Sequence, residues 1–241
     1  MSEVLGGFEE MGNVVDNVGE RHIACVLLVD TSGSMAGASI NELNQGLLEF
    51  GNALDQDEHA RGVADVCVIS FNSNVETVVP FCPAANYSAP TLSAGGLTSM
   101  NEAVIAGLDA IEERKQLYRQ LGCSYYRPWM FLLTDGEPTD QNMEGEAKNR
   151  LQQALNDKKV NFFPMGIGAG ANYDHLKSYT KGGERGSVKG ERKPVQGGLR
   201  LAVQQYERDQ QFRSQPWKRY AGAHAHDHRT DLTELFKRPA R

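Results

Sequence analysis

Side chains that carry oxygen follow two strongly apolar segments of the chain, at the point where each segment ends. Asp30 follows the run Val26–Val29, and Ser32 and Ser34 come two and four residues later. Asp135 follows a second apolar run in the same way. One carboxylate and two hydroxyls suit a hard cation such as Mg²⁺ or Mn²⁺. Taken singly, each aspartate has a commoner explanation, the capping of a helix that begins after a strand. The hypothesis of a metal site therefore depends on whether the fold brings the segments together.

Short continuous apolar runs alternate with apolar residues at helical spacing, which predicts alternating strands and helices. The predicted strands cover residues 23–30, 63–71, 75–79, 129–134 and 160–167. The predicted helices have apolar faces within residues 40–54, 104–115, 143–156 and 173–179. This order favours a doubly wound α/β fold, in which a mostly parallel sheet carries helices on both faces. The strand at 75–79 follows a hairpin turn and should form one antiparallel edge strand.

The carboxyl ends of parallel strands meet at one edge of such a sheet, where open α/β sheets bind their ligands. The glycine-rich loop 92–100 carries Thr98 to the same end. Two carboxylates and three hydroxyls would then form a near-octahedral set around Mg²⁺ or Mn²⁺, with at least one position open to water or an outside group. The predicted metal ligands are Asp30, Ser32, Ser34, Thr98 and Asp135.

The order of these residues resembles the metal-ion-dependent adhesion site of von Willebrand factor type A domains, and the resemblance extends over residues 22–180. The strings LLVDTSGSM, LSAGGLTSM and FLLTDGEPTD are more similar to bacterial tellurite-resistance-associated members than to integrin or matrix members. The resemblance implies a non-enzymatic module in which an Asp or Glu of a partner protein completes the coordination of the metal. It also implies a role in bacterial tellurite or stress resistance, with kinase-like or phosphatase-like proteins as partners.

An enzymatic alternative is a Mg²⁺-dependent phosphotransferase or phosphatase that uses Asp30 as its nucleophile. That chemistry needs a second carboxylate two residues later, where Ser32 stands, and no Lys or Arg lies near these loops to hold a phosphate. A structural role without metal is a third alternative. The glycines between residues 166 and 170 follow a strand, as a phosphate-binding loop would, but glycines that leave a strand are common. We do not expect nucleotide binding.

The composition argues against several other classes of function. A net charge of −6 does not favour a nucleic acid or an anionic membrane as partner, and no apolar run approaches the roughly 20 residues that span a bilayer. The acidic N-terminus lacks the features of a signal peptide, so we expect a cytoplasmic protein. The charged residues 112–115 are interpreted as a solvated helix face, and three histidines as isolated: His22, His59 and His175. Four scattered cysteines fit a reducing compartment and argue against a zinc site. They are Cys25, Cys67, Cys82 and Cys123.

Composition also divides the chain into a polar lead-in (1–20), a von Willebrand factor A-like domain (21–190) and a tail (191–241). The tail is rich in Gln, Arg and His and poor in large aliphatic residues, so it should be disordered. One choice of codons from Val195 onward, read one nucleotide later, encodes FKEAFVWLSNSMSVI, which resembles the closing amphipathic helix of the family. We therefore favour a frame-shifted translation over a natural Gln- and Arg-rich appendage.

Overall fold

The computed structural model describes residues 14–168 and 171–180, which form one sheet and the helices around it. The strands are β1 (Ile23–Asp30), β2 (Ala64–Phe71), β3 (Val75–Pro83), β4 (Trp129–Thr134) and β5 (Asn161–Gly166). The α-helices are α2 (Ala38–Gln56), α3 (Glu58–Val63), α4 (Met100–Gln120), α5 (Glu144–Asn156) and α6 (Tyr173–Ser178). Short 3-10 turns lie at η1 (Gly33–Met35), η2 (Ala84–Asn86) and η3 (Gln141–Met143).

The sheet has the strand order β3-β2-β1-β4-β5. β1 pairs in parallel with β2 and with β4, β5 pairs in parallel with β4, and β3 is antiparallel to β2. Every side chain of β1 is buried, as expected for a central strand that is covered on both faces. The chain first adds strands on one side of β1 and then on the other, so the strand order reverses between β1 and β4. The predicted α/β fold, mostly parallel with one antiparallel edge strand, is confirmed.

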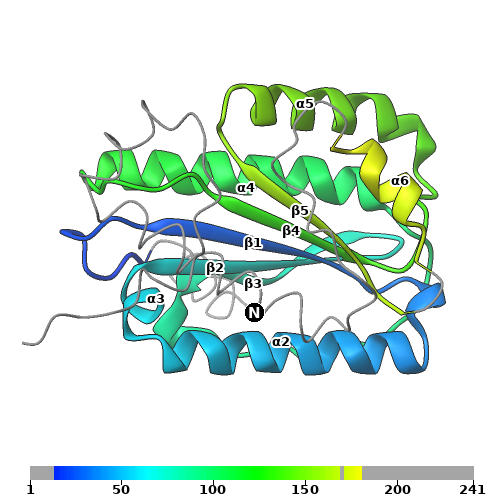
Figure 1. Cartoon of the computed structure of the whole chain (residues 1–241), viewed down its shortest axis with the longest axis horizontal. Coiled ribbons are helices and arrows are strands. Elements are labelled where there is room, and N and C mark those ends of the chain that lie inside the picture. Colours follow the sequence, from blue (N-terminus) through cyan, green and yellow to red (C-terminus); the bar gives the residue numbers. More distant parts are fainter. Residues whose placement is uncertain (1–13, 169–170, 181–241) are drawn as a thin grey trace, which may run out of the picture. The chain divides into compact units, whose positions relative to one another are not determined.

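Helices cover both faces of this sheet (Figure 1): α2 lies on one side, and α4 and α5 lie together on the other. α4 approaches the sheet closely at Gly107, where an added Cβ would lie 2.9 Å from side-chain atoms of Leu28 and Met130. Glycine at this position therefore sets the separation of helix and sheet. α2 buries the apolar face that its spacing predicts, which consists of Ile40, Leu43, Leu47, Phe50 and Leu54.

The edge strand and its neighbourhood differ from the prediction. β3 continues to Pro83, beyond the predicted end at Val79, and contains two prolines. Proline is tolerated there because an edge strand has N–H groups that need no partner strand. The short helix α3 is absent from the sequence prediction and takes Val63 from the predicted second strand. The side chain of Asp57 caps it by accepting hydrogen bonds from two backbone N–H groups of its first turn.

A buried ionic cluster lies at the end of the sheet where β1 and β2 begin. Nη2 of Arg114 lies 3.0 Å from Oδ1 of Asp65, and Nδ1 of His22 lies 3.2 Å from Oδ2 of the same carboxylate. Tyr118 donates its hydroxyl to Asp65 as well. None of these four side chains is more than 2% exposed. The interpretation of residues 112–115 as a solvated face is therefore wrong for Arg114 and for Lys115, which is also buried. The interpretation of His22 as isolated is wrong as well.

Several predictions fall outside the described residues. The first thirteen residues of the lead-in and the whole tail at 191–241 are among them, so the disorder of the tail and its reading frame stay predictions. The proposed loop at 166–170 is described only to residue 168. In the ranges that are described, no helix is both long enough and apolar enough to cross a membrane.

Candidate metal centre

The aspartate at the end of β1 is the most deeply buried group of the predicted metal site. Asp30 has no exposed surface, and both of its carboxylate oxygens accept hydrogen bonds. Oδ1 accepts from the backbone N–H of Ser32 at 2.8 Å, and Oδ2 accepts from the hydroxyl of Thr134 at 2.5 Å. Because Thr134 ends β4, the second bond joins the ends of β1 and β4. Asp30 thus lies where the strand order reverses, the usual position of a ligand site in open α/β sheets.

Two side-chain contacts connect the loops that follow β1 and β4. The Oγ atoms of Ser32 and Ser34 lie 3.0 Å apart, and the hydroxyl of Ser34 donates to Oδ1 of Asp135 at 2.8 Å. Neighbouring ligand oxygens around an octahedral Mg²⁺, with bonds of about 2.0–2.1 Å, are about 2.9 Å apart. The two separations that involve Oγ of Ser34 are therefore compatible with neighbouring ligand positions around one cation. Ser34 is exposed and Asp135 is half-buried, so an outside group can reach them.

The loop before α4 holds Thr98 between the same two segments. Gly33 donates its N–H to the carbonyl of Gly96 at 3.0 Å, which fastens the loop to the β1 exit. Thr98 donates its N–H to Oγ1 of Thr139 at 3.0 Å and accepts the N–H of Thr139 at 2.9 Å, which fastens it to the β4 exit. Gly96 has φ +82°, and an added Cβ would lie 2.6 Å from Oγ of Ser73, so only glycine fits there. Thr98 itself is 6% exposed.

The charge at this end of the sheet also fits a cation. Burial raises the pKa of Asp30, hydrogen bonds from Ser32 and Thr134 lower it, and the negative charge of Asp135 raises it further, so that the net shift is upward. A divalent cation beside these two carboxylates would stabilise both in their charged form. No three His, Cys, Asp or Glu side chains converge as a metal site within residues 14–168 and 171–180. A cation here would therefore need hydroxyl ligands in addition to the two carboxylates.

A second layer of polar residues supports the Thr98 loop, and sequence reasoning missed it. Asp140 accepts hydrogen bonds from the backbone N–H groups of Asn101 (3.3 Å) and Glu102 (2.9 Å) in the first turn of α4. The side-chain amide of Asn101, which has no exposed surface, donates to Asp140 and accepts the hydroxyl of Tyr179. The one sequence signal for this layer is Asn101 itself, a polar residue at helical spacing from the apolar residues Val104, Ile105 and Leu108.

Comparisons with known proteins give the family of this chain. Residues 25–189 match the von Willebrand factor type A domain. The chain is 24% identical over 162 residues to inter-alpha-trypsin inhibitor heavy chain H3 of Mesocricetus auratus, and the alignment covers 64% of this chain and 17% of that protein. The chain spans less than a fifth of the length of the curated relatives it matches.

Among solved structures, the fold is similar to the PilB minor pilin of Streptococcus sanguinis (TM-score 0.60, 13% identity, 82% of this chain and 64% of that chain). It is also similar to an aerotolerance-related membrane protein of Bacteroides fragilis (TM-score 0.51, 12% identity, 76% of this chain and 97% of that chain). At these identities the likeness concerns the fold alone. Von Willebrand factor type A domains are protein-interaction modules, often metal-dependent and generally non-enzymatic. Because the match covers more than half of the sequence and the fold agrees with it, the chain belongs to the von Willebrand factor type A domain family.

Proposed function

We propose that this chain is a non-enzymatic, metal-dependent protein-binding module. A Mg²⁺ or Mn²⁺ ion would be held by the five predicted ligands, Asp30, Ser32, Ser34, Thr98 and Asp135, and an Asp or Glu of a partner protein would complete its coordination. The observation that carries the proposal is the chain of oxygens from Ser32 through Ser34 to Asp135, whose separations of 3.0 and 2.8 Å match neighbouring positions around one cation.

The proposed ligands would have different roles because they differ in burial. Asp30 is fixed by two hydrogen bonds and would supply negative charge from the buried side of the site. Ser34 is exposed and Asp135 is half-buried, so these two lie on the side that solvent reaches. When bound, the ion supplies an electrophilic centre, because hydroxyl ligands neutralise less of its charge than carboxylates would. The serine hydroxyls would then turn their lone pairs toward the ion, and the open side of the site would accept a carboxylate from outside.

The geometry does not favour the phosphotransferase alternative. A nucleophilic aspartate must reach a phosphorus atom, but Asp30 has no exposed surface and both of its oxygens accept hydrogen bonds. The loops at this end of the sheet contain no Lys or Arg to stabilise a transferring phosphoryl group.

The finer biological role rests on the resemblance of the three sequence strings. We propose a cytoplasmic protein of a bacterial tellurite- or stress-resistance system, with kinase-like or phosphatase-like proteins among its partners. A pull-down from the source cell, with and without chelator, addresses this directly. A partner that is retained only while Mg²⁺ or Mn²⁺ is present supports the proposal, and partners that are indifferent to chelation contradict it.

Calorimetric titration with Mg²⁺ and Mn²⁺ tests the site itself. Asp135→Ala should weaken metal binding by at least about 100-fold, because changes even in the supporting residues of metal sites cost about 10–100-fold. Asp174→Ala is the matched control, since it removes an exposed carboxylate from α6, at the same end of the sheet. If the wild type and Asp135→Ala bind the metal equally, and circular dichroism shows that both proteins are folded, the assignment of Asp135 as a metal ligand is wrong.

A further inference from the structure

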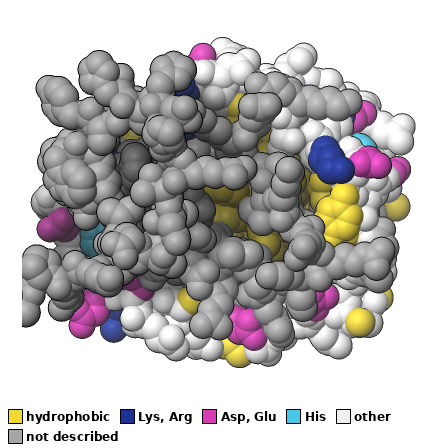
Figure 2. Space-filling view, viewed as in Figure 1, with side chains coloured by type: hydrophobic (Ala, Val, Ile, Leu, Met, Phe, Trp, Pro, Cys, Tyr) yellow, Lys and Arg dark blue, Asp and Glu magenta, His cyan; other side chains and the backbone are white. Residues whose placement is uncertain are grey.

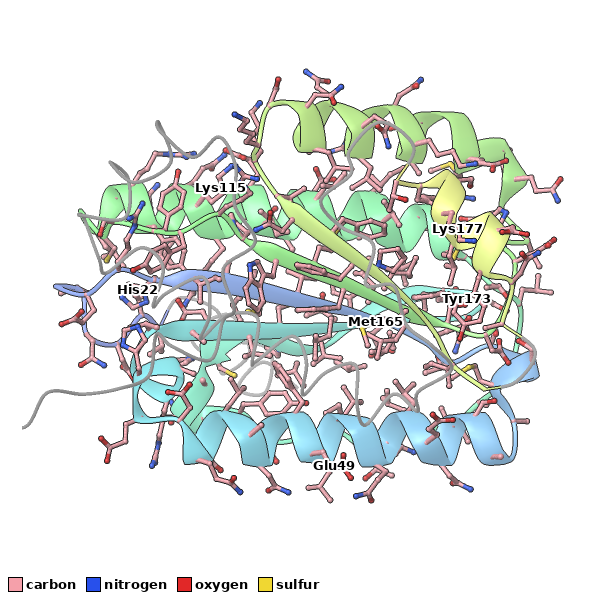
Figure 3. The ribbon with its side chains drawn as sticks, viewed as in Figure 1. His22, Glu49, Lys115, Met165, Tyr173 and Lys177 are labelled. Atoms are coloured by element: carbon pink, nitrogen blue, oxygen red, sulfur yellow. The ribbon has the colours of Figure 1, made fainter. Side chains whose placement is uncertain are left out.

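Two large apolar side chains are exposed on the segments that surround the candidate metal centre. Leu97 directly precedes Thr98 and is 61% exposed, and Tyr173 begins α6 and is 46% exposed. Figure 3 shows Tyr173 at the end of the sheet opposite His22, which is the end where the parallel strands finish. Single exposed apolar residues are normal on protein surfaces. What distinguishes these two is how firmly the backbone holds them.

The backbone of Leu97 is fixed from both sides. Its N–H donates to Oγ of Ser73 at 2.9 Å, in the turn between β2 and β3. Two residues later Ser99 donates its N–H to the carbonyl of Asn72 at 2.8 Å, in the same turn. The preceding Gly96 is confined by its positive φ and by contact with Ser73. Leu97 is therefore presented to solvent on a loop that is tied to the end of β2.

Tyr173 is held in a comparable way at the end of β5. The side chain of Asn172 caps α6 by accepting the N–H of His175 at 3.0 Å, and it also donates to the carboxylate of Glu137. The ring lies over Gly166, the last residue of β5, where an added Cβ would be 2.9 Å from two ring carbons. Figure 2 shows hydrophobic side chains that reach the surface beside a Lys or Arg in the region where Figure 1 places α6.

The strand order sets the distance between Leu97 and Tyr173, which we call the two anchors. Leu97 lies at the β2 side of the site and Tyr173 at the β5 side, with the ends of β1 and β4 between them. Three strand spacings of about 4.8 Å separate β2 from β5 by about 14 Å, so each anchor lies about 7 Å from the middle of the site. In an extended segment, the residues two positions before and after a given residue point to the same side and lie about 7 Å away.

The charged residues around the candidate metal centre also restrict which partner segments can bind there. The loops 31–37, 72–74, 92–99, 135–143, 167–168 and 171–172 contain no Lys or Arg, whereas Glu137 and Asp140 lie in them beside Asp135. Glu76 lies at the start of β3, and Lys177 of α6 is paired with Asp174. A single carboxylate can be accepted by a metal, but further acidic residues in the occupant would meet repulsion from these acidic residues. Neutral or basic residues beside the acidic residue of the partner would not be repelled.

We propose that the partner segment is extended and has the pattern apolar–x–acid–x–apolar, with no second acidic residue, and that Leu97 and Tyr173 receive its two apolar side chains. This proposal rests on the proposed function, because the metal receives the central carboxylate. It assigns Leu97 and Tyr173 the role of specificity determinants beside the site.

Synthetic peptides test the pattern with the full chain and excess Mg²⁺. The first probe is acetyl-Gly-Leu-Ser-Asp-Ser-Leu-Gly-amide, and the second is its isomer acetyl-Gly-Ser-Leu-Asp-Leu-Ser-Gly-amide, in which the leucines flank the acid directly. Binding is followed by NMR titration. The first peptide should bind at least about fivefold more tightly than the isomer, since only its leucines can reach both anchors and leave water. Leu97→Ser and Tyr173→Ser should each remove most of this preference.

Leu48→Ser is the matched control, because Leu48 is an exposed leucine (50%) on the outer side of α2. It should leave the preference unchanged. Calorimetric titration with Mg²⁺ alone tests the metal site separately from the role of Leu97 and Tyr173. If Mg²⁺ binds but the two peptides bind equally or not at all, the assignment of the anchors is overturned while the metal site stands. If Mg²⁺ itself does not bind, the proposed function fails first.

Discussion

The hydroxyl of Tyr179 donates to the side-chain carbonyl of Asn101 at 2.5 Å, which joins two residues that lie 78 positions apart. Tyr179 directly follows α6, and Asn101 lies in the first turn of α4, three residues after Thr98. Burial raises the pKa of Tyr179, so its phenol stays protonated and remains a donor. Through Asn101 and Asp140, the end of α6 and the Thr98 loop share one network of hydrogen bonds.

This network predicts that Tyr179→Phe weakens metal binding. Loss of the hydroxyl leaves the carbonyl of Asn101 without its donor, and Thr98 becomes less firmly placed. Because second-layer changes cost about 10–100-fold in metal affinity, we expect a loss of about tenfold in calorimetric titration with Mn²⁺. Tyr118→Phe is the control, since it removes an equally buried hydroxyl at the other end of the sheet. Comparable losses in both variants would mean that general destabilisation, rather than the network, is responsible.

The ionic cluster around Asp65 predicts a large effect on stability. Asp65→Asn removes the counter-charge of Arg114, whose side chain is 1% exposed and cannot turn to solvent. Breaking a buried pair from one side costs about 3–5 kcal/mol, whereas an exposed pair is worth about 0.2–1 kcal/mol. Urea denaturation should therefore show a loss of about 3 kcal/mol or more for Asp65→Asn. Asp109→Asn, which breaks the exposed pair with Arg150, should lose less than about 1 kcal/mol. Losses of equal size would contradict the account.

The same cluster predicts how stability depends on pH. Burial lowers the pKa of His22, but the neighbouring Asp65 carboxylate and the carbonyl of Asn17 raise it, and the balance lies above 6.5 even though the charge of Arg114 opposes it. A histidine with a raised folded-state pKa stabilises the fold fully below its unfolded pKa and loses this contribution as pH rises through the folded value. The free energy of unfolding should therefore fall as pH rises from 6.5, and His22→Gln should flatten this slope. An unchanged slope in the variant would assign the pH dependence to other groups.

How far the sequence could predict the fold is shown by α4. Its buried stripe continues at helical spacing from Val104 through Ile111 to Lys115 and Tyr118, but the sequence prediction ended the helix at the charged residues 112–115 and interpreted them as solvated. Arg114 and Lys115 lie on that stripe because long side chains can bury their stems and bring their charge to a partner. The partner of Arg114 is Asp65, in a strand 49 residues earlier. Pairings of this kind arise only in the folded chain, so periodicity alone could not identify them.

The candidate site was more predictable than its support. Asp30, Ser32, Ser34 and Asp135 lie at strand ends, and the parallel order of β1 and β4 brings such ends together in any sheet of this class. Asp140 carries no comparable signal. Its role in holding α4 depends on a loop conformation that no local pattern specifies.

A frame-shifted tail would deprive the sheet of the amphipathic helix that closes the domain in the family the sequence resembles. Trp129, Phe131 and Phe163 pack on one another with ring centroids 4.9–5.9 Å apart, on the face of β4 and β5 opposite Met130 and the core beneath α4. The alternative-frame sequence FKEAFVWLSNSMSVI offers an amphipathic helix with large apolar side chains for such a face. Each buried side chain contributes about 1.5–3 kcal/mol, against a typical stability of about 5–15 kcal/mol.

A chain that carries the alternative-frame tail should therefore melt at a higher temperature, more cooperatively, and remain soluble at higher concentration than the chain with the present tail. Resequencing the source gene through Arg192 is the first measurement, and thermal melting of the two proteins followed by circular dichroism is the second. A version that ends at Thr180 serves as control, because it separates the gain from a new helix from the removal of the present tail. An intact reading frame together with equal melting of the first two proteins would rule out the frame shift and leave the tail as a natural appendage.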